Sequence, residues 1–132
     1  MESKICLDTD FLVNILRNKR EEADFIKINE ADKDLATTYM NLLELYYGAY
    51  KSQERENNLK AISLLLSRLN ILNLSDESVK KSGEILVKLE KEGKTIDFRD
   101  LFIGTIALVN NYSLKTNNIR HFNRIEELRI MD

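Results

Sequence analysis

The chain has few of the residues that define several common classes of small protein. Its 132 residues include one cysteine, one histidine, four glycines and no proline. A single cysteine, Cys6, excludes a disulfide framework and a zinc site built from cysteines. Cys6 lies in an apolar run, so we expect it to be a small core residue. No repeat or low-complexity tract marks a boundary, and we expect residues 1–132 to form one domain.

The net charge is small, and the chain has no long apolar segment. The net charge is only −2 although 32% of residues are charged, so overall charge indicates no partner. The longest apolar run, residues 101–109, is far shorter than the ~20 residues of a membrane span. Asp8 and Asp10 precede any long apolar stretch. We therefore expect no signal peptide, no membrane association, and a reducing, cytoplasmic location.

Strand-like and helix-like apolar patterns alternate along the chain. We expect strands near residues 4–8, 34–39, 71–74, 112–116 and 128–131. We expect helices near residues 11–20, 21–31, 40–51, 54–69, 75–93 and 96–110. This alternation predicts right-handed crossovers and a mainly parallel sheet covered by helices on both faces. The expected fold class is α/β, a three-layer α/β/α sandwich.

Three helices carry more detailed predictions about burial. The helix over 75–93 is expected to pack through Val79, Ser82, Leu86 and Leu89. The helix over 96–110 is apolar nearly all round, which predicts a central and buried position. In the helix over 40–51, the tyrosines at positions 46, 47 and 50 are expected to lie in the core or in an interface.

Four acidic residues stand in or beside apolar segments. Asp8 ends the first apolar run, Glu44 interrupts residues 42–47, and Asp97 and Asp100 open the apolar run 101–109. Carboxylates are rarely buried unless they are paired, hydrogen-bonded or bound to a metal. Parallel sheets bind ligands beyond the carboxyl ends of their strands, where Asp8 is expected. A meeting of these acids there would form an oxygen-rich site for Mg²⁺.

Each acid also has a structural interpretation. Asp97 is well placed as the N-cap of its helix, with Asp100 three residues later, and for Asp97 we favour capping. Asp8 is equally suited to capping the helix that follows it, and Asp10 is typical of an acid favoured by the helix dipole. Glu44 is the hardest to explain structurally, because a carboxylate in an apolar helical stretch needs a partner.

Four segments carry a resemblance to a known family. They are Ile5–Leu12, Asn41–Ala49, Ile96–Thr105 and Leu114–Phe122. In order and spacing they resemble the motifs of PIN-domain nucleases, especially the VapC toxins of toxin–antitoxin pairs. The resemblance implies a central parallel sheet between helices and a Mg²⁺- or Mn²⁺-dependent endoribonuclease, in which Asp8, Glu44 and Asp100 match the family's metal-binding acids.

The chain departs from the family pattern in its last motif. Many relatives have a fourth acid there, where this chain has Asn118 and His121. The resemblance implies that Asn118 hydrogen-bonds a metal-bound water or orients a carboxylate, and Asp97 is a candidate for the missing charge. His121 is expected to be an exposed loop residue.

The same resemblance implies partners. A VapB-like antitoxin is expected to lay an amphipathic helix in an apolar groove and to place an arginine in the acidic cluster. A homodimer is also implied, with the tyrosine-rich helix as a candidate face. RNA would be held by local basic residues, since the net charge is slightly negative. The candidates are Arg17, Lys19, Arg20, Lys115, Arg120 and Arg124.

Three alternatives remain open from the sequence. The chain could be an RNA-processing PIN nuclease without a toxin role, or a PIN-like interaction module that has lost activity. It could also be a phosphatase of the haloacid dehalogenase type, with Asp8 as the nucleophile. That family needs a late motif in which glycine precedes aspartate, and none of the four glycines here does so.

Overall fold

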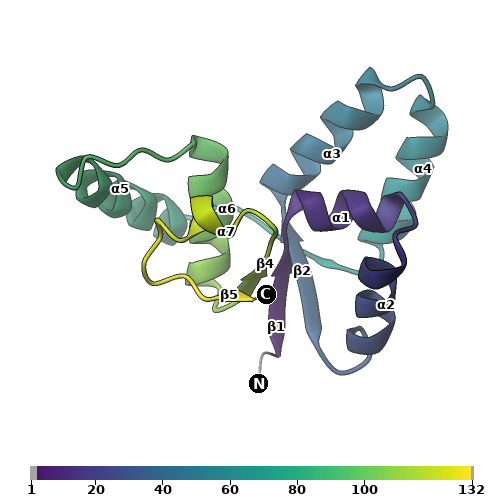
Figure 1. Cartoon of the computed structure of the whole chain (residues 1–132), viewed down its shortest axis with the longest axis horizontal. Coiled ribbons are helices and arrows are strands. Elements are labelled where there is room, and N and C mark those ends of the chain that lie inside the picture. Colours follow the sequence, from purple (N-terminus) through teal and green to yellow (C-terminus); the bar gives the residue numbers. More distant parts are fainter. Residues whose placement is uncertain (1–2, 132) are drawn as a thin grey trace.

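The computed structural model describes residues 3–131, and its elements alternate between strands and helices along most of the chain (Figure 1). The strands are β1 (Lys4–Leu7), β2 (Asp34–Thr38), β3 (Asn70–Leu72), β4 (Ser113–Lys115) and β5 (Ile130–Met131). The helices are α1 (Thr9–Leu16), α2 (Arg20–Asn29), α3 (Tyr39–Lys51), α4 (Arg55–Leu66), α5 (Asp76–Lys91), α6 (Phe98–Val109) and α7 (Ile119–Phe122).

The five strands form one sheet in the order β3-β2-β1-β4-β5, and every neighbouring pair is parallel. Strand β1 lies at the centre, with Ile5 opposite Leu35 of β2 and opposite Ser113 of β4. Ile5, Cys6 and Leu7 are fully buried, which is typical of a parallel strand covered on both faces. The predicted parallel sheet and the predicted burial of Cys6 are confirmed.

Side chains of β1 alternate between two hydrophobic cores, one on each face of the sheet. Ile5 and Leu7 pack with residues of α1, α2, α3 and α4, such as Leu12 and Ile62. Cys6 points to the other face and packs with residues of α5, α6 and α7. Figure 1 shows the two helix groups on opposite sides of the sheet. The three-layer architecture expected from the sequence is therefore confirmed.

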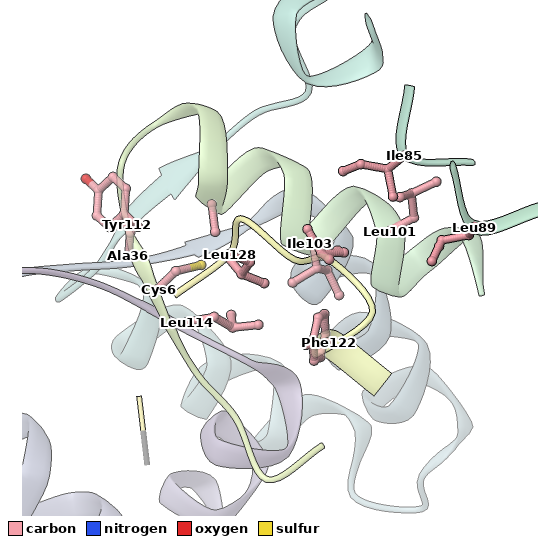
Figure 2. Close-up of a cluster of buried hydrophobic side chains, with 12 residues drawn as sticks. Cys6, Ala36, Ile85, Leu89, Leu101, Ile103, Tyr112, Leu114, Phe122 and Leu128 are labelled. Atoms are coloured by element: carbon pink, nitrogen blue, oxygen red, sulfur yellow. The ribbon is translucent and has the colours of Figure 1, made fainter. Parts of the chain in front are cut away.

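Helix α6 fills the centre of the second core. Its residues Leu101 and Ile103 pack with Leu114 of β4 and Phe122 of α7, and Figure 2 shows these side chains in one cluster with Cys6. The buried position predicted for this helix is confirmed, apart from the exposed Phe98 and Arg99 at its start. In the described part of the chain no helix is both long and apolar enough to cross a membrane.

The packing face predicted for α5 is confirmed at Ser82, Leu86 and Leu89 and wrong at Val79. Val79 is 47% exposed, whereas Ser78 and Ser82 are buried with Ile85 and Leu89. The Ser82 hydroxyl bonds the Ser78 carbonyl at 2.7 Å and lies 2.9 Å from the Thr105 hydroxyl of α6. Ser78, which was not predicted, can be buried because its own hydroxyl donates to the Ser75 carbonyl at 2.9 Å, a contribution that a hydrophobic pattern does not register.

Two smaller expectations also differ from the structure. The loop expected at His121 contains the short helix α7, which is anchored by the fully buried Phe122. Tyr46, Tyr47 and Tyr50 are 36%, 62% and 54% exposed, so a core position for them is wrong and an interface remains the open interpretation. The last strand is shorter than expected but does lie at the sheet edge.

Candidate functional site

The carboxyl ends of three adjacent strands bring the sequence motifs together. Leu7 of β1 is opposite Lys115 of β4, so the residues that follow them, Asp8 and Thr116, leave the sheet side by side. The Asp8 amide donates to the Lys115 carbonyl at 3.0 Å. Strand β2 lies on the other side of β1 and runs directly into α3, which carries Glu44.

Two neutral side chains donate hydrogen bonds to the Asp8 carboxylate. Its side chain is buried, with Asp8 4% exposed. One oxygen, Oδ1, accepts from the Asn41 amide at 3.1 Å, and Oδ2 accepts from the Thr116 hydroxyl at 2.7 Å. Asp8 occupies the N-cap position of α1 but makes no side-chain cap hydrogen bond there. Its carboxylate is therefore directed into the site and is not used as a simple helix cap.

Glu44 has a hydrogen-bond partner, as expected for a carboxylate in an apolar helical stretch. Its Oε1 accepts from the Thr9 hydroxyl at 2.8 Å, and the Thr9 oxygen in turn accepts from the Asn41 amide at 2.9 Å. Thr9 follows Asp8 directly, so the carboxylates of Asp8 and Glu44 are joined through two shared neutral side chains. The structure thus brings these two predicted site residues together.

The electrostatic environment of Asp8 is costly for a charge. Burial raises the pKa of Asp8 to about 6 from an ordinary value of 3.8. The Thr116 hydrogen bond opposes the rise in this pKa, whereas the charges of Asp10 and Glu44 add to it. A buried carboxylate beside two other acids is the arrangement that a divalent cation would relieve.

The last motif is tied to the first by backbone hydrogen bonds. The Asn117 amide donates to Asp10 Oδ2 at 3.1 Å, and the Asn118 amide donates to Thr116 Oγ1 at 2.9 Å. Asp10 also accepts from the Phe11 amide, as expected of a first-turn acid. The Asn118 side chain is exposed at the start of α7 and makes no cap hydrogen bond.

The N-terminus of α6 carries the other two acids. Asp97 caps the helix, since its Oδ1 accepts from the Arg99 amide at 2.8 Å, and this bond lowers its pKa. Burial, with the Asp97 charge, raises the pKa of Asp100. Asp100 Oδ2 lies 3.5 Å from His121 Nδ1. The pKa of Arg99 is raised chiefly by Asp97 and also by Glu44 and Asp100, so its guanidinium lies in the field of acids from both α3 and α6.

Asp8 and Glu44 are linked by shared hydrogen-bond partners, whereas Asp100 lies beside His121. Across residues 3–131, no three histidine, cysteine, aspartate or glutamate side chains are grouped closely enough to hold a metal ion. Carboxylates repel one another when no cation lies between them, and Asp100 is turned towards His121. The assignment of Asp8, Glu44 and Asp100 as metal ligands, with Asn118 as the fourth catalytic position, stays a prediction.

The sequence interpretation missed the neutral residues that support the acids. Thr9, Asn41 and Thr116 supply the donors, and Arg99 supplies a nearby positive charge. Each lies inside one of the four motifs. A buried carboxylate must receive hydrogen bonds, so short polar residues beside the acids were the available signal.

Three of the six basic residues proposed to hold RNA already have partners within the protein. Arg20 pairs with Asp24 at 3.8 Å, and the Lys115 ammonium lies 5.6 Å from the centre of the Phe25 ring. Arg124 donates to the Thr95 carbonyl. The other three candidates have exposed side chains: Arg17, Lys19 and Arg120.

The sequence matches known proteins over almost its full length. Residues 5–128 match the family model described as PIN domain. The chain is 32% identical over 126 residues to Ribonuclease VapC2 of Haemophilus influenzae, covering 96% of this chain and 95% of that protein. It is 31% identical over 129 residues to the tRNA(fMet)-specific endonuclease VapC of Salmonella typhimurium, covering 98% and 97%.

Solved structures give the same result. The chain superimposes with a TM-score of 0.90 and 30% identity on a chain of VapBC2 from Rickettsia felis bound to a DNA fragment from its promoter, covering 96% of both chains. It superimposes with a TM-score of 0.89 and 30% identity on a chain of DNA-bound VapBC from Salmonella typhimurium, covering 98% and 97%.

Proposed function

The chain belongs to the PIN-domain family, and on that basis we propose that it is a Mg²⁺- or Mn²⁺-dependent endoribonuclease that acts as the toxin of a toxin–antitoxin pair. The observation that carries this proposal is the paired carboxylates of Asp8 and Glu44 beyond the end of β1. Relatives named ribonuclease VapC, similar over nearly their full length, support the RNA substrate.

The side chains of the site fit a hard divalent cation. They offer carboxylate and hydroxyl oxygens, and Mg²⁺ is usually held by one or two carboxylates together with water and substrate phosphate. Asp8 and Glu44 would hold the ion, with Asp100 as the third carboxylate. When bound, the ion would activate a water molecule and neutralise charge on the phosphate.

The remaining residues of the site would orient these ligands and the RNA. Thr116 fixes one oxygen of Asp8 through its hydroxyl, and the Asn118 amide holds that hydroxyl in place. Arg99, in the field of Glu44 and Asp100, is a suitable cation for an RNA phosphate beside the acids. The exposed Arg17, Lys19 and Arg120 would hold phosphates farther along the strand.

An RNA cleavage assay tests the activity. Purified protein with Mn²⁺ should cut mixed RNAs, and a chelator should stop cleavage. Asp8→Asn and Asp100→Asn should each remove activity, because each removes a ligand charge. The matched control is Asp76→Asn, which changes an exposed first-turn acid of α5 and should cleave normally. Full turnover by Asp8→Asn would remove this residue from the proposed role.

The apolar groove beside the acids suits the proposed antitoxin. A groove of about 320 Å³ runs between α1, α3 and α4, with Glu44 and Arg17 among its lining residues. Its apolar lining includes Val13, Leu16, Leu45, Ala49 and Ile62. The similar structures from Rickettsia felis and Salmonella typhimurium are VapBC complexes. We propose that an amphipathic VapB-like helix lies here and that one of its arginines reaches Glu44.

The toxin role is tested in growing cells. Expression of the chain alone should arrest growth, and the Asp8→Asn variant should not. Co-expression of a cognate antitoxin should restore growth with the intact chain. Equal toxicity of the intact chain and the Asp8→Asn variant would show that the arrest does not come from this site.

The exposed aromatic face of α3 supports a homodimer. Tyr39, Leu43, Tyr47 and Tyr50 are all more than half exposed. Aromatic residues of this kind are enriched where proteins associate. We propose that this face pairs two copies, and that Tyr47→Lys shifts the protein to the monomer in sedimentation equilibrium. A monomeric intact protein would contradict the dimer.

The three alternative functions are not equally supported. The family match includes the Asp8 segment, which supports the nuclease motif over the phosphatase motif. An RNA-processing nuclease would show the same metal-dependent cleavage but cause no growth arrest. An inactive interaction module would bind its partner without cutting RNA, and the exposed Asn118, at the position of a fourth acid, keeps this candidate open.

A further inference from the structure

Both polar atoms of the Asn41 side-chain amide are hydrogen-bonded within the protein. It is fully buried at the first turn of α3. Its Oδ1 accepts from the Thr38 amide at 3.1 Å and from the Thr38 hydroxyl at 2.7 Å. Its Nδ2 donates to Asp8 Oδ1 at 3.1 Å and to Thr9 Oγ1 at 2.9 Å. The orientation of the amide is fixed, because the Thr38 backbone amide can only donate.

This orientation also fixes the proton of the Thr9 hydroxyl. A threonine hydroxyl has one proton, and since its oxygen accepts from Asn41, that proton is directed to Glu44 Oε1 at 2.8 Å. The hydrogen bonds therefore run in one sense, from Thr38 to Asn41, then to Asp8 on one branch and through Thr9 to Glu44 on the other. Asp8 and Glu44 each accept one hydrogen bond from this network.

We propose that Asn41 and Thr9 are positioning residues that hold the Asp8 and Glu44 carboxylates in a fixed relation suited to a shared divalent ion. The inference deepens the proposed function and rests on it. Two nearby carboxylates repel each other, and neutral donors placed between them offset that repulsion without cancelling the charge that a cation needs. Residues that orient metal ligands in this way typically change metal affinity by about 10–100-fold when they are replaced.

A second helix of the same chain separates this role from simple capping. Thr38 and Asn41 form a capping box at α3, and Ser75 and Ser78 form one at α5. The Ser78 hydroxyl accepts from the Ser75 amide at 2.7 Å, as Asn41 does from Thr38. Capping alone is therefore achieved by a serine in this protein. The longer amide of Asn41 adds the reach to Asp8 and Thr9, which a serine lacks.

The decisive variant is Asn41→Ser, which keeps an N3 hydroxyl for the capping box but cannot reach the acids. Mn²⁺ alone is the probe, and the free ion is measured by electron paramagnetic resonance in the full chain without RNA. We expect Asn41→Ser to weaken Mn²⁺ binding about tenfold or more. The matched control is Ser78→Ala, which removes the corresponding cap residue of α5 and should lower the urea midpoint while leaving Mn²⁺ binding unchanged.

Thr9 gives a second test that does not depend on the folding of Asn41→Ser. Thr9→Val keeps the shape of the side chain but removes the hydroxyl, and we expect weaker Mn²⁺ binding. Thr9→Ser restores the hydroxyl and should restore affinity. A role in packing alone would give the opposite order, because valine is closer to threonine in shape.

The outcomes distinguish this inference from the proposed function. Intact protein that binds Mn²⁺ but cuts no RNA contradicts the nuclease function, while the Mn²⁺ constants of the variants still decide the positioning role. Wild-type affinity in Asn41→Ser or in Thr9→Val overturns the positioning role even if RNA is cleaved. Intact protein that binds no Mn²⁺ also overturns it.

Discussion

Replacing Asp8 by asparagine should stabilise the metal-free protein at neutral and alkaline pH. The pKa of Asp8 is raised from 3.8 to about 6, chiefly by burial. The folded protein therefore holds the Asp8 proton more tightly than the unfolded chain. Between these two values stability falls as pH rises, and above about pH 6 the full cost of the buried charge is present. Below pH 3.8 the cost disappears, since both states are protonated.

The shift sets the size of the expected gain. Each pKa unit corresponds to about 1.4 kcal/mol, so the charge of Asp8 destabilises the folded state by about 3 kcal/mol at pH 8. Asparagine removes this cost but keeps only one acceptor oxygen, which must face the Asn41 amide. Its new NH2 group then faces Thr116, so the hydrogen bond that the Thr116 hydroxyl donates is lost. That loss offsets about 1–2 kcal/mol. A net gain of about 1–2 kcal/mol in the free energy of unfolding should remain.

Urea denaturation at pH 8 and pH 4, with a chelator present, measures the effect. Asp8→Asn should raise the midpoint at pH 8, and the difference from the intact chain should nearly vanish or reverse at pH 4. Asp76→Asn, at an exposed position, should show no such dependence on pH. An Asp8→Asn variant that is less stable than the intact chain at pH 8 would refute the reasoning, because the carboxylate would then stabilise the fold.

Three further predictions concern the packing around the sheet. Tyr112→Phe removes the hydroxyl that donates to Asp34 Oδ2 at 2.7 Å, and it should lower the free energy of unfolding by about 1–2 kcal/mol; an unchanged urea midpoint would contradict this. In Gly104→Ala the new Cβ would clash with Ile125 Cδ1, so we expect a loss of about 1–2 kcal/mol that Ile125→Val largely recovers; no recovery in the double variant would place the strain elsewhere. Cys6 is fully buried and burial raises the pKa of its thiol, so a thiol reagent should label it only in urea, and rapid labelling of the native protein would show an open core.

The sheet could be predicted from the sequence because its signal is local. Runs such as Ile5–Leu7 are short, apolar and separated by helical patterns, and together these features determine a parallel sheet. The position of Asp8 at a strand end followed from the same pattern. Helix α7 was missed because Asn117 and Asn118 are typical of a turn, and its burial depends on Phe122, which packs against distant residues.

The details of the site could not be predicted because they depend on contacts between distant segments. Asn41 lies 33 positions from Asp8, and Thr116 lies 108 positions from it. The sequence shows that a buried acid needs donors but does not show which residues provide them. Likewise, Asp97 and Asp100 have the same spacing as a capping box, yet Asp97 caps the helix while Asp100 lies against His121.

Anomalous diffraction from crystals soaked in Mn²⁺ tests the central claim most directly, because it locates the ion without reference to activity. We expect an anomalous peak within coordination distance of carboxylate oxygens of both Asp8 and Glu44, with Asp100 turned from His121 towards it. A saturated crystal with no peak at this pair, or with its only peak at other residues, would contradict the claim that these acids form a metal site.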